Sequence, residues 1–130
     1  MEAKTWELEI PLTEILGSYC SKEDPATGTV VIHAGRVKLP GKVKAGMTHV
    51  FLEPCVDNPG EGLSRIGKEA GKRFRINRVQ VHHRLGRALP GEYLLVVLAS
   101  AVTRGPAFDA CRWIVDEIKR EKIIRLVEME

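Results

Sequence analysis

The sequence has 130 residues, the usual size of one domain, of which 44% are hydrophobic and 28% are charged. These fractions are typical of a globular protein and exclude a disordered or collagen-like chain. The net charge of +3, from 20 Lys and Arg against 17 Asp and Glu, is too small to imply a nucleic-acid partner by itself. We therefore expect a single domain over residues 1–130.

The apolar segments and the cysteines indicate a cytoplasmic protein that does not enter a membrane. The longest apolar run, Tyr93–Val102, is about half of the roughly 20 residues that a transmembrane helix needs. Because Glu2, Lys4, Glu7 and Glu9 leave no apolar stretch near the N-terminus, we expect no signal peptide. The three cysteines lack C-x-x-C spacing, and the adjacent His82 and His83 would point to opposite faces of a strand. We expect no disulfide framework, no metal and no cofactor.

The first half of the chain reads as short elements separated by turns. The predicted elements are a weak strand at 6–10, a helix at 12–19 after Pro11, and strands at 29–38 and 48–54. Thr13 is a candidate cap for the helix. The segment Leu39–Lys42 contains Pro-Gly, which is typical of a type II turn or of a loop tip. The basic residues around this turn make it a loop tip that can reach over a site.

The second half contains the longer elements. The predictions are a helix that starts at Asn58, strands at 79–85 and 93–102, a helix that starts near Pro106, and a strand or partner-covering segment at 123–127. Asn58 followed by Pro59 is a strong helix start, and Glu61 can complete a capping box. Strands broken by two substantial helices, without regular alternation, predict an α+β domain with a mainly antiparallel sheet and two main helices.

Basic residues gather in two groups. One lies on the polar face of the predicted helix after Asn58, and the other surrounds Lys38. The first group consists of Arg65, Lys68, Lys72, Arg73, Arg75 and Arg78, and the second of Arg36, Lys38, Lys42 and Lys44. A solvated helix face explains the first group. Its one interposed aromatic residue, Phe74, follows the apolar stripe of that helix, so the group lacks the interleaved aromatics that base stacking needs. A nucleic-acid partner is therefore the less favoured interpretation.

Three segments carry a resemblance to a known family. They are Gly28–Lys38 (GTVVIHAGRVK), Val81–Glu92 (VHHRLGRALPGE) and Arg104–Lys119 (RGPAFDACRWIVDEIK). In order and spacing they resemble the large, catalytic subunit of molybdopterin synthase, over roughly a hundred residues from Gly28 onward.

The resemblance implies an α/β-hammerhead fold and a sulfurtransferase. In that family a ubiquitin-like small subunit inserts its C-terminal Gly-Gly thiocarboxylate into a pocket of the large subunit. Sulfur passes to cyclic pyranopterin monophosphate, a pterin phosphate, to form molybdopterin in molybdenum cofactor biosynthesis. Two large subunits form a central homodimer, and each carries one small subunit, so the assembly is a heterotetramer.

Carried over residue by residue, the family site is only partly present. Lys119 falls on the family's catalytic lysine, and Arg104 on the arginine of its His-Arg pair. Thr103 replaces the histidine of that pair, Lys38 replaces an arginine, and Leu126 replaces a second lysine. The resemblance implies Lys119 as the catalytic residue, and as substrate-binding residues Arg104, Lys38, Thr103, and Arg125 or Lys122 in place of the lost lysine.

Three interpretations follow. The first is a divergent, active large subunit, in which Arg104 and the loop from Lys38 to Lys44 line one anion site. The second is a non-catalytic paralogue that keeps the homodimer and the small-subunit surface. The third is a nucleic-acid binder that uses the group from Arg65 to Arg78. His83, on the apolar side of its predicted strand, is expected to be a core histidine satisfied by hydrogen bonds.

Overall fold

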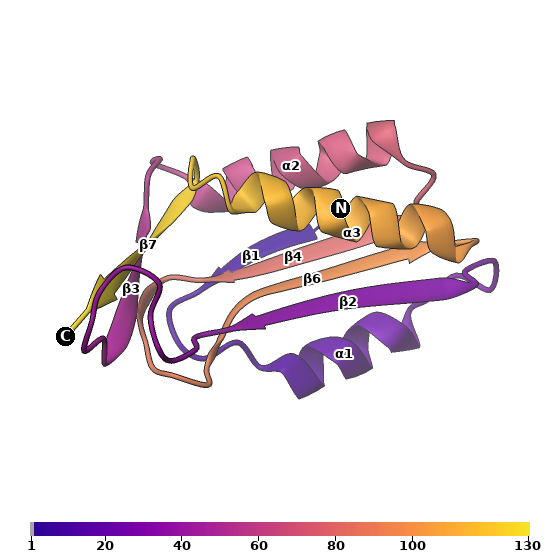
Figure 1. Cartoon of the computed structure of the whole chain (residues 1–130). Helices are drawn as coiled ribbons and strands as arrows, with labels where there is room; N and C mark the ends of the chain where they lie inside the picture. The colour runs from indigo at the N-terminus through magenta and orange to yellow at the C-terminus, as the bar shows by residue number, and fades with distance from the viewer. Residues whose placement is uncertain (1) are drawn as a thin grey trace.

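The computed structural model describes residues 2–130 and places ten elements in two sheets and three helices (Figure 1). The larger sheet has the strand order β1-β4-β6-β2, and the smaller one has the order β5-β3-β7. The elements are β1 (Glu2–Trp6), α1 (Leu12–Ser21), β2 (Thr29–Arg36), β3 (His49–Pro54), α2 (Pro59–Arg73), β4 (Arg78–Arg84), β5 (Gly86–Ala88), β6 (Tyr93–Ala101), α3 (Arg104–Ile118) and β7 (Ile124–Met129).

The larger sheet is covered on both faces. Helices α2 and α3 lie on one face and α1 lies on the other (Figure 1). Strand β6 shows why: Val97 and Ala99 pack in the core under α2 and α3, whereas Val96 and Leu98 pack with Ile15 of α1. Because alternate side chains of a strand point to opposite faces, this run of apolar residues fills two cores.

The smaller sheet lies across one end of the larger one (Figure 1). Its strands pair antiparallel, with Leu52 of β3 opposite both Gly86 of β5 and Leu126 of β7. In the larger sheet only the β1–β4 pair is parallel. The predicted α+β class with a mainly antiparallel sheet is confirmed, as is the pairing of the C-terminal segment as a strand.

The start of α2 follows its local sequence. The Asn58 side chain accepts a hydrogen bond from the Glu61 backbone N–H at 3.1 Å, and Pro59 is the first helical residue. This cap satisfies one of the N–H groups that a helix start leaves without a partner. The Glu61 carboxylate instead pairs with Arg65, so the predicted capping box is only half formed.

Three local predictions are wrong. The first strand covers residues 2–6 instead of 6–10, because it is held by pairing with β4 and not by its own alternation. Helix α1 starts after Pro11, and no side chain caps it, so Thr13 has no such role. The segment 39–42 is not a type II turn, because Gly41 lacks the positive φ that this turn requires, which Gly46 has instead.

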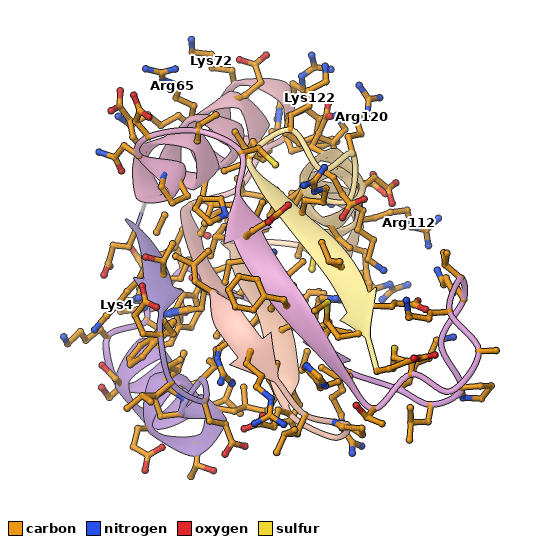
Figure 2. The ribbon with its side chains drawn as sticks, turned by 90° about the vertical axis from the view of Figure 1, so that its left-hand side faces the viewer. Lys4, Arg65, Lys72, Arg112, Arg120 and Lys122 are labelled. Atoms are coloured by element: carbon orange, nitrogen blue, oxygen red, sulfur yellow. The ribbon has the colours of Figure 1, made fainter. Side chains whose placement is uncertain are left out.

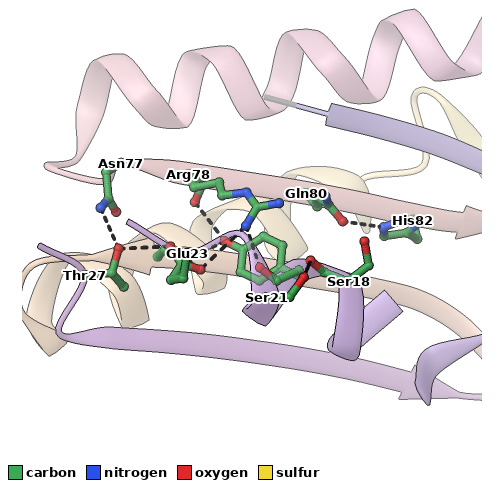
Figure 3. Close-up of polar contacts among 10 residues, drawn as sticks. Ser18, Ser21, Glu23, Thr27, Asn77, Arg78, Gln80 and His82 are labelled. Carbon is green, nitrogen blue, oxygen red and sulfur yellow. Dashed lines mark hydrogen bonds and ion pairs between the residues drawn. The ribbon is translucent and has the colours of Figure 1, made fainter. Parts of the chain in front are cut away.

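A buried polar network fastens α1 to the larger sheet. The Tyr19 hydroxyl lies 2.5 Å from the Ser100 hydroxyl, and the Arg78 guanidinium donates to the Tyr19 carbonyl at 2.6 Å. Glu23 accepts from Ser100 at 2.9 Å and joins Thr27 and Arg78 (Figure 3). Burial raises the pKa of Tyr19 to about 12, because the tyrosinate would lose its hydration there.

Candidate functional site

A cavity of about 990 Å³ lies between the two sheets. Its walls are the end of α3, the loop from Val37 to Thr48 and the inner face of β3 and β7, with His83 of β4 and Leu95 of β6 facing it. Apolar side chains of the small sheet, including Val50 and Leu52, form one wall. A ligand can therefore contact both sheets and the loop at once.

The cavity is strongly basic. Six cationic side chains line it: Arg36, Lys38, Lys42, Lys44, Lys119 and Arg125. Two carboxylates, Glu121 and Glu128, also line it, and both already accept backbone N–H groups. The excess of fixed positive charge makes the cavity suitable for an anionic ligand.

The basic loop is held over the cavity by Glu128 of β7. The Glu128 carboxylate accepts the backbone N–H groups of Lys42 at 2.8 Å, Val43 at 3.0 Å and Lys44 at 2.7 Å. A Cβ at Gly41 would come within 2.4 Å of that carboxylate, so a larger residue at position 41 would have to displace Glu128 from its place beside the loop. The Lys44 N–H, followed by those of Val43 and Lys42, lowers the pKa of Glu128.

Lys119 enters the cavity from the end of α3. It is the C-cap residue of that helix, and its backbone N–H bonds to the Val115 carbonyl at 3.0 Å. A cation at this position is favoured by the partial negative charge of a helix C-terminus. The Lys119 side chain is exposed and forms no ion pair in the described chain, so its charge is available to a ligand.

The candidates for the missing lysine are placed differently. Leu126 lines the cavity, so a lysine at that position would face the ligand. Arg125 also lines it, but its guanidinium is paired with Glu53 of β3. Lys122 points outward from the turn after α3 (Figure 2) and is not part of the lining. Lys38, Lys42 and Lys44 are the lysines that share the cavity with Lys119.

Thr103 and Arg104 lie at the opposite end of α3. Thr103 is the N-cap residue and Arg104 the first residue of this 15-residue helix, whereas Lys119 follows its last residue. At 1.5 Å per residue the two ends are about 22 Å apart. Neither residue lines the cavity, so a single protomer does not bring Arg104 and the Lys38–Lys44 loop together at one anion site.

The other basic group lies away from the cavity. Arg65 and Lys72 point outward from α2 (Figure 2). Arg65 pairs with Glu61 at 2.6 Å and Arg73 with Glu69 at 3.2 Å, each one helical turn apart. This arrangement is that of a solvated helix face with intrahelical ion pairs.

The other features considered in the sequence are the cysteines, possible metal ligands and apolar segments. Cys20 and Cys55 are exposed and Cys111 is buried, all as free thiols. Within residues 2–130, no group of three His, Cys, Asp or Glu side chains is placed to hold a metal ion. None of the described helices is long and apolar enough to cross a membrane.

Sequence reasoning missed the role of Glu128. Its residue type and position carry no local signal, because the N–H groups that it accepts are more than 80 residues away in the chain. The one local feature of the loop that relates to this contact is Gly41, which precedes the three donor residues 42–44. In the sequence, that glycine indicated only a turn or loop tip.

Comparison with known proteins places the chain in a family. A family model described as MoaE protein matches residues 8–121, which extends the resemblance about 20 residues before Gly28. The molybdopterin synthase catalytic subunit of Pyrococcus abyssi is 37% identical over 98 residues, covering 73% of this chain and 64% of that protein. The protein of the same name from Pseudomonas aeruginosa is 36% identical over 94 residues, covering 71% and 61%. The chain thus spans less than two thirds of the length of these relatives.

Solved structures share the fold. Molybdopterin synthase from Staphylococcus aureus superposes with a TM-score of 0.78 at 20% identity, covering 98% of this chain and 89% of that one. A complex of subunits 1 and 2 of molybdopterin-converting factor from Helicobacter pylori contains a chain with a TM-score of 0.76 at 15% identity, covering 97% and 83%. With the family match over most of its length, the chain belongs to the MoaE family, whose relatives include molybdopterin synthase catalytic subunits.

Proposed function

We propose that this chain is the catalytic subunit of a molybdopterin synthase. It transfers sulfur from the thiocarboxylated C-terminus of a ubiquitin-like small subunit to cyclic pyranopterin monophosphate, in the cytoplasm. The observation that carries the proposal is the convergence of Lys119 with the basic loop on one cavity. The relatives from Pyrococcus abyssi and Pseudomonas aeruginosa, both named molybdopterin synthase catalytic subunits, support it.

The charge of the cavity fits both reactants. A pterin phosphate and a thiocarboxylate are anions, and holding them close together requires several fixed cations. Lys119, which lines the cavity, orients the thiocarboxylate in this proposal and exchanges a proton as a thioester intermediate forms and breaks. Lys38, Lys42 and Lys44 provide positive charge in place of the lysine that Leu126 replaces. Because Glu128 binds the backbone of their loop, the loop is ordered before a ligand binds.

The size of the cavity is compatible with the tail of a small-subunit partner. An extended Gly-Gly tail is narrow, and the cavity is large enough, at about 990 Å³, to take it beside a substrate. The Helicobacter pylori relative was solved as a complex of two different subunits. We therefore include a ubiquitin-like partner in the proposal.

A homodimer would explain Arg104. This arginine is about 22 Å from Lys119 along α3, so it reaches a Lys119 cavity only if that cavity belongs to a second copy. Thr103 lies beside it and would come with it. Light scattering at micromolar concentration should give about twice the chain mass, and a clean monomer would remove Arg104 and Thr103 from the site.

One observation favours a second candidate function, a non-catalytic paralogue. Leu126 faces the cavity where the family has a lysine, and loss of one general acid-base group lowers a rate roughly 100- to 10,000-fold. Such a paralogue would keep the small-subunit surface and the homodimer without the chemistry.

Turnover separates the two functions. The full chain is mixed with a thiocarboxylated small subunit and cyclic pyranopterin monophosphate, and molybdopterin is measured. Formation of molybdopterin over repeated turnovers supports the catalytic proposal. Binding of the small subunit without product supports the paralogue, and absence of both overturns the proposed function.

A further inference from the structure

His83 occupies the floor of the cavity, a position that the proposed mechanism does not use. It lies on β4, two residues after Val81, and like Val81 it faces the side of the sheet covered by α2 and α3. Its partner across the sheet is Leu95 of β6, which also lines the cavity. His83 is only 6% exposed, so its ring is in a fixed environment at the base of the basic cavity.

The hydrogen bonding of His83 determines which ring nitrogen is free. Nδ1 lies 2.8 Å from the backbone carbonyl oxygen of Arg84, and a carbonyl oxygen only accepts, so Nδ1 carries the proton. Burial lowers the pKa of His83, which keeps the ring neutral. In the neutral ring Nε2 is then an acceptor, and no group of residues 2–130 donates to it.

No other polar side chain of the described cavity lining is a neutral hydrogen-bond acceptor. Six are cations, which donate only. Glu128 accepts three N–H groups of the loop, and Glu121 accepts the Leu126 N–H at 2.6 Å. Among the side chains of the described lining, His83 is the one neutral nitrogen or oxygen acceptor. A ligand that combines an anion with an N–H or O–H donor therefore finds complementary groups at Lys119 and at His83.

We propose that His83 Nε2 accepts a hydrogen bond from an N–H donor of the pterin ring while the lysines hold its phosphate. The inference rests on the proposed function. It identifies His83 as the residue that recognises the pterin ring, whereas the lysines recognise the charge of the phosphate. A pterin carries amine and amide N–H groups, whereas inorganic phosphate bound by the lysines would not need His83. His83 is thus a specificity-determining residue, and the expected core role is only half of its contribution.

Two substitutions separate the two ring nitrogens. His83→Asn places an amide N–H near the position of Nδ1, so the bond to the Arg84 carbonyl can persist while the Nε2 acceptor is lost. His83→Gln places an amide near the position of Nε2. The matched control is His82→Gln on the same strand, because both nitrogens of His82 already have partners. One partner is Trp6 and the other is Gln80, which Figure 3 shows.

Calorimetry of the full chain with cyclic pyranopterin monophosphate, and separately with inorganic phosphate, tests the proposal. We expect His83→Asn to weaken pterin binding about tenfold, with His83→Gln and His82→Gln closer to wild type. Phosphate binding and the thermal midpoint of His83→Asn should stay near those of wild type.

The outcomes distinguish this inference from the function on which it rests. Wild type that binds and turns over the pterin, with equal affinity in His83→Asn, overturns only the role of His83. Equal loss of phosphate and pterin binding in His83→Asn also overturns it, because the residue would then shape the whole cavity. Wild type that binds neither ligand overturns the proposed function, and this inference falls with it.

Discussion

Strands β6 and β7 show how differently the two sheets are built. Strand β6 has a neighbour on each side and helices on both faces, and its residues from Leu95 to Ala101 are all buried. Strand β7 is at the edge of the small sheet, and only Ile124 of its six residues is buried. The larger sheet therefore holds the fold together, whereas the small sheet presents side chains and a loop to the cavity.

This difference separates stability from chemistry. Apolar burial dominates folding free energy, and most of it lies around the larger sheet. The cations of the cavity are mostly exposed and contribute little to folding. Substitutions in the two regions should thus change different measurements, and each prediction below tests that separation.

The largest effect is expected at the cavity. Lys119→Ala should lower molybdopterin formation roughly 100- to 10,000-fold, because it removes the cation that is placed to orient the thiocarboxylate and to exchange a proton as the thioester intermediate forms and breaks. The thermal midpoint should stay close to that of wild type, since the side chain is exposed. Lys122→Ala, in the same turn but pointing outward, is the control. A Lys119→Ala variant that keeps most of the wild-type rate would disprove the assignment.

The next effect is expected in the larger sheet. Leu98→Ala should lower the free energy of unfolding by about 2–5 kcal/mol, because Leu98 is fully buried against α1 and its truncation leaves a cavity. Urea unfolding measures this change. Leu8→Ala, at a side chain that is 79% exposed, should change it by less than about 0.5 kcal/mol. A similar loss at both positions would contradict the packing described for β6.

A pH effect should also be confined to the larger sheet. The folded pKa of Tyr19, about 12, is above the ordinary value of 10.0, so the fold favours the protonated hydroxyl. Its contribution to stability is therefore complete below pH 10 and is lost as the pH rises through about 12. Ultraviolet absorbance of a Tyr93→Phe variant, which leaves Tyr19 as the only tyrosine, follows this ionisation. Ionisation near pH 10 in the folded state would show that Tyr19 is not buried as described.

The smallest change in stability is expected at Glu128. Glu128→Ala should release the loop, because three backbone N–H groups lose their acceptor, while the core of the larger sheet is untouched. Trypsin should then cleave after Lys42 or Lys44 faster than in wild type, with little change in thermal midpoint. Glu130→Ala, which removes a nearby carboxylate without such bonds, is the control. Equal cleavage of wild type and Glu128→Ala would show that other contacts hold the loop.

Much of the framework followed from the sequence alone. The β-branched run after Gly28, the alternation from Val79 to Leu85 and the Asn58-Pro59 helix start each identified an element, because strand and cap preferences are local. The motif that ends at Lys119 identified the family, and the α+β class followed from the order of elements. Lys38 and Lys119, both chosen from the sequence as site residues, line the same cavity.

Only the tertiary structure decided which of the other candidates meet. Arg104 and Lys119 are separated by the full length of α3, since a helix fixes its ends 1.5 Å per residue apart. Glu128 organises a loop more than 80 residues away, and β1 takes its position from β4 instead of from its own pattern. His83 bonds through Nδ1 to the Arg84 carbonyl, and its Nε2 stays free as an acceptor because the ring borders the cavity beside the small sheet. These relations depend on contacts between distant segments, which composition and periodicity do not encode.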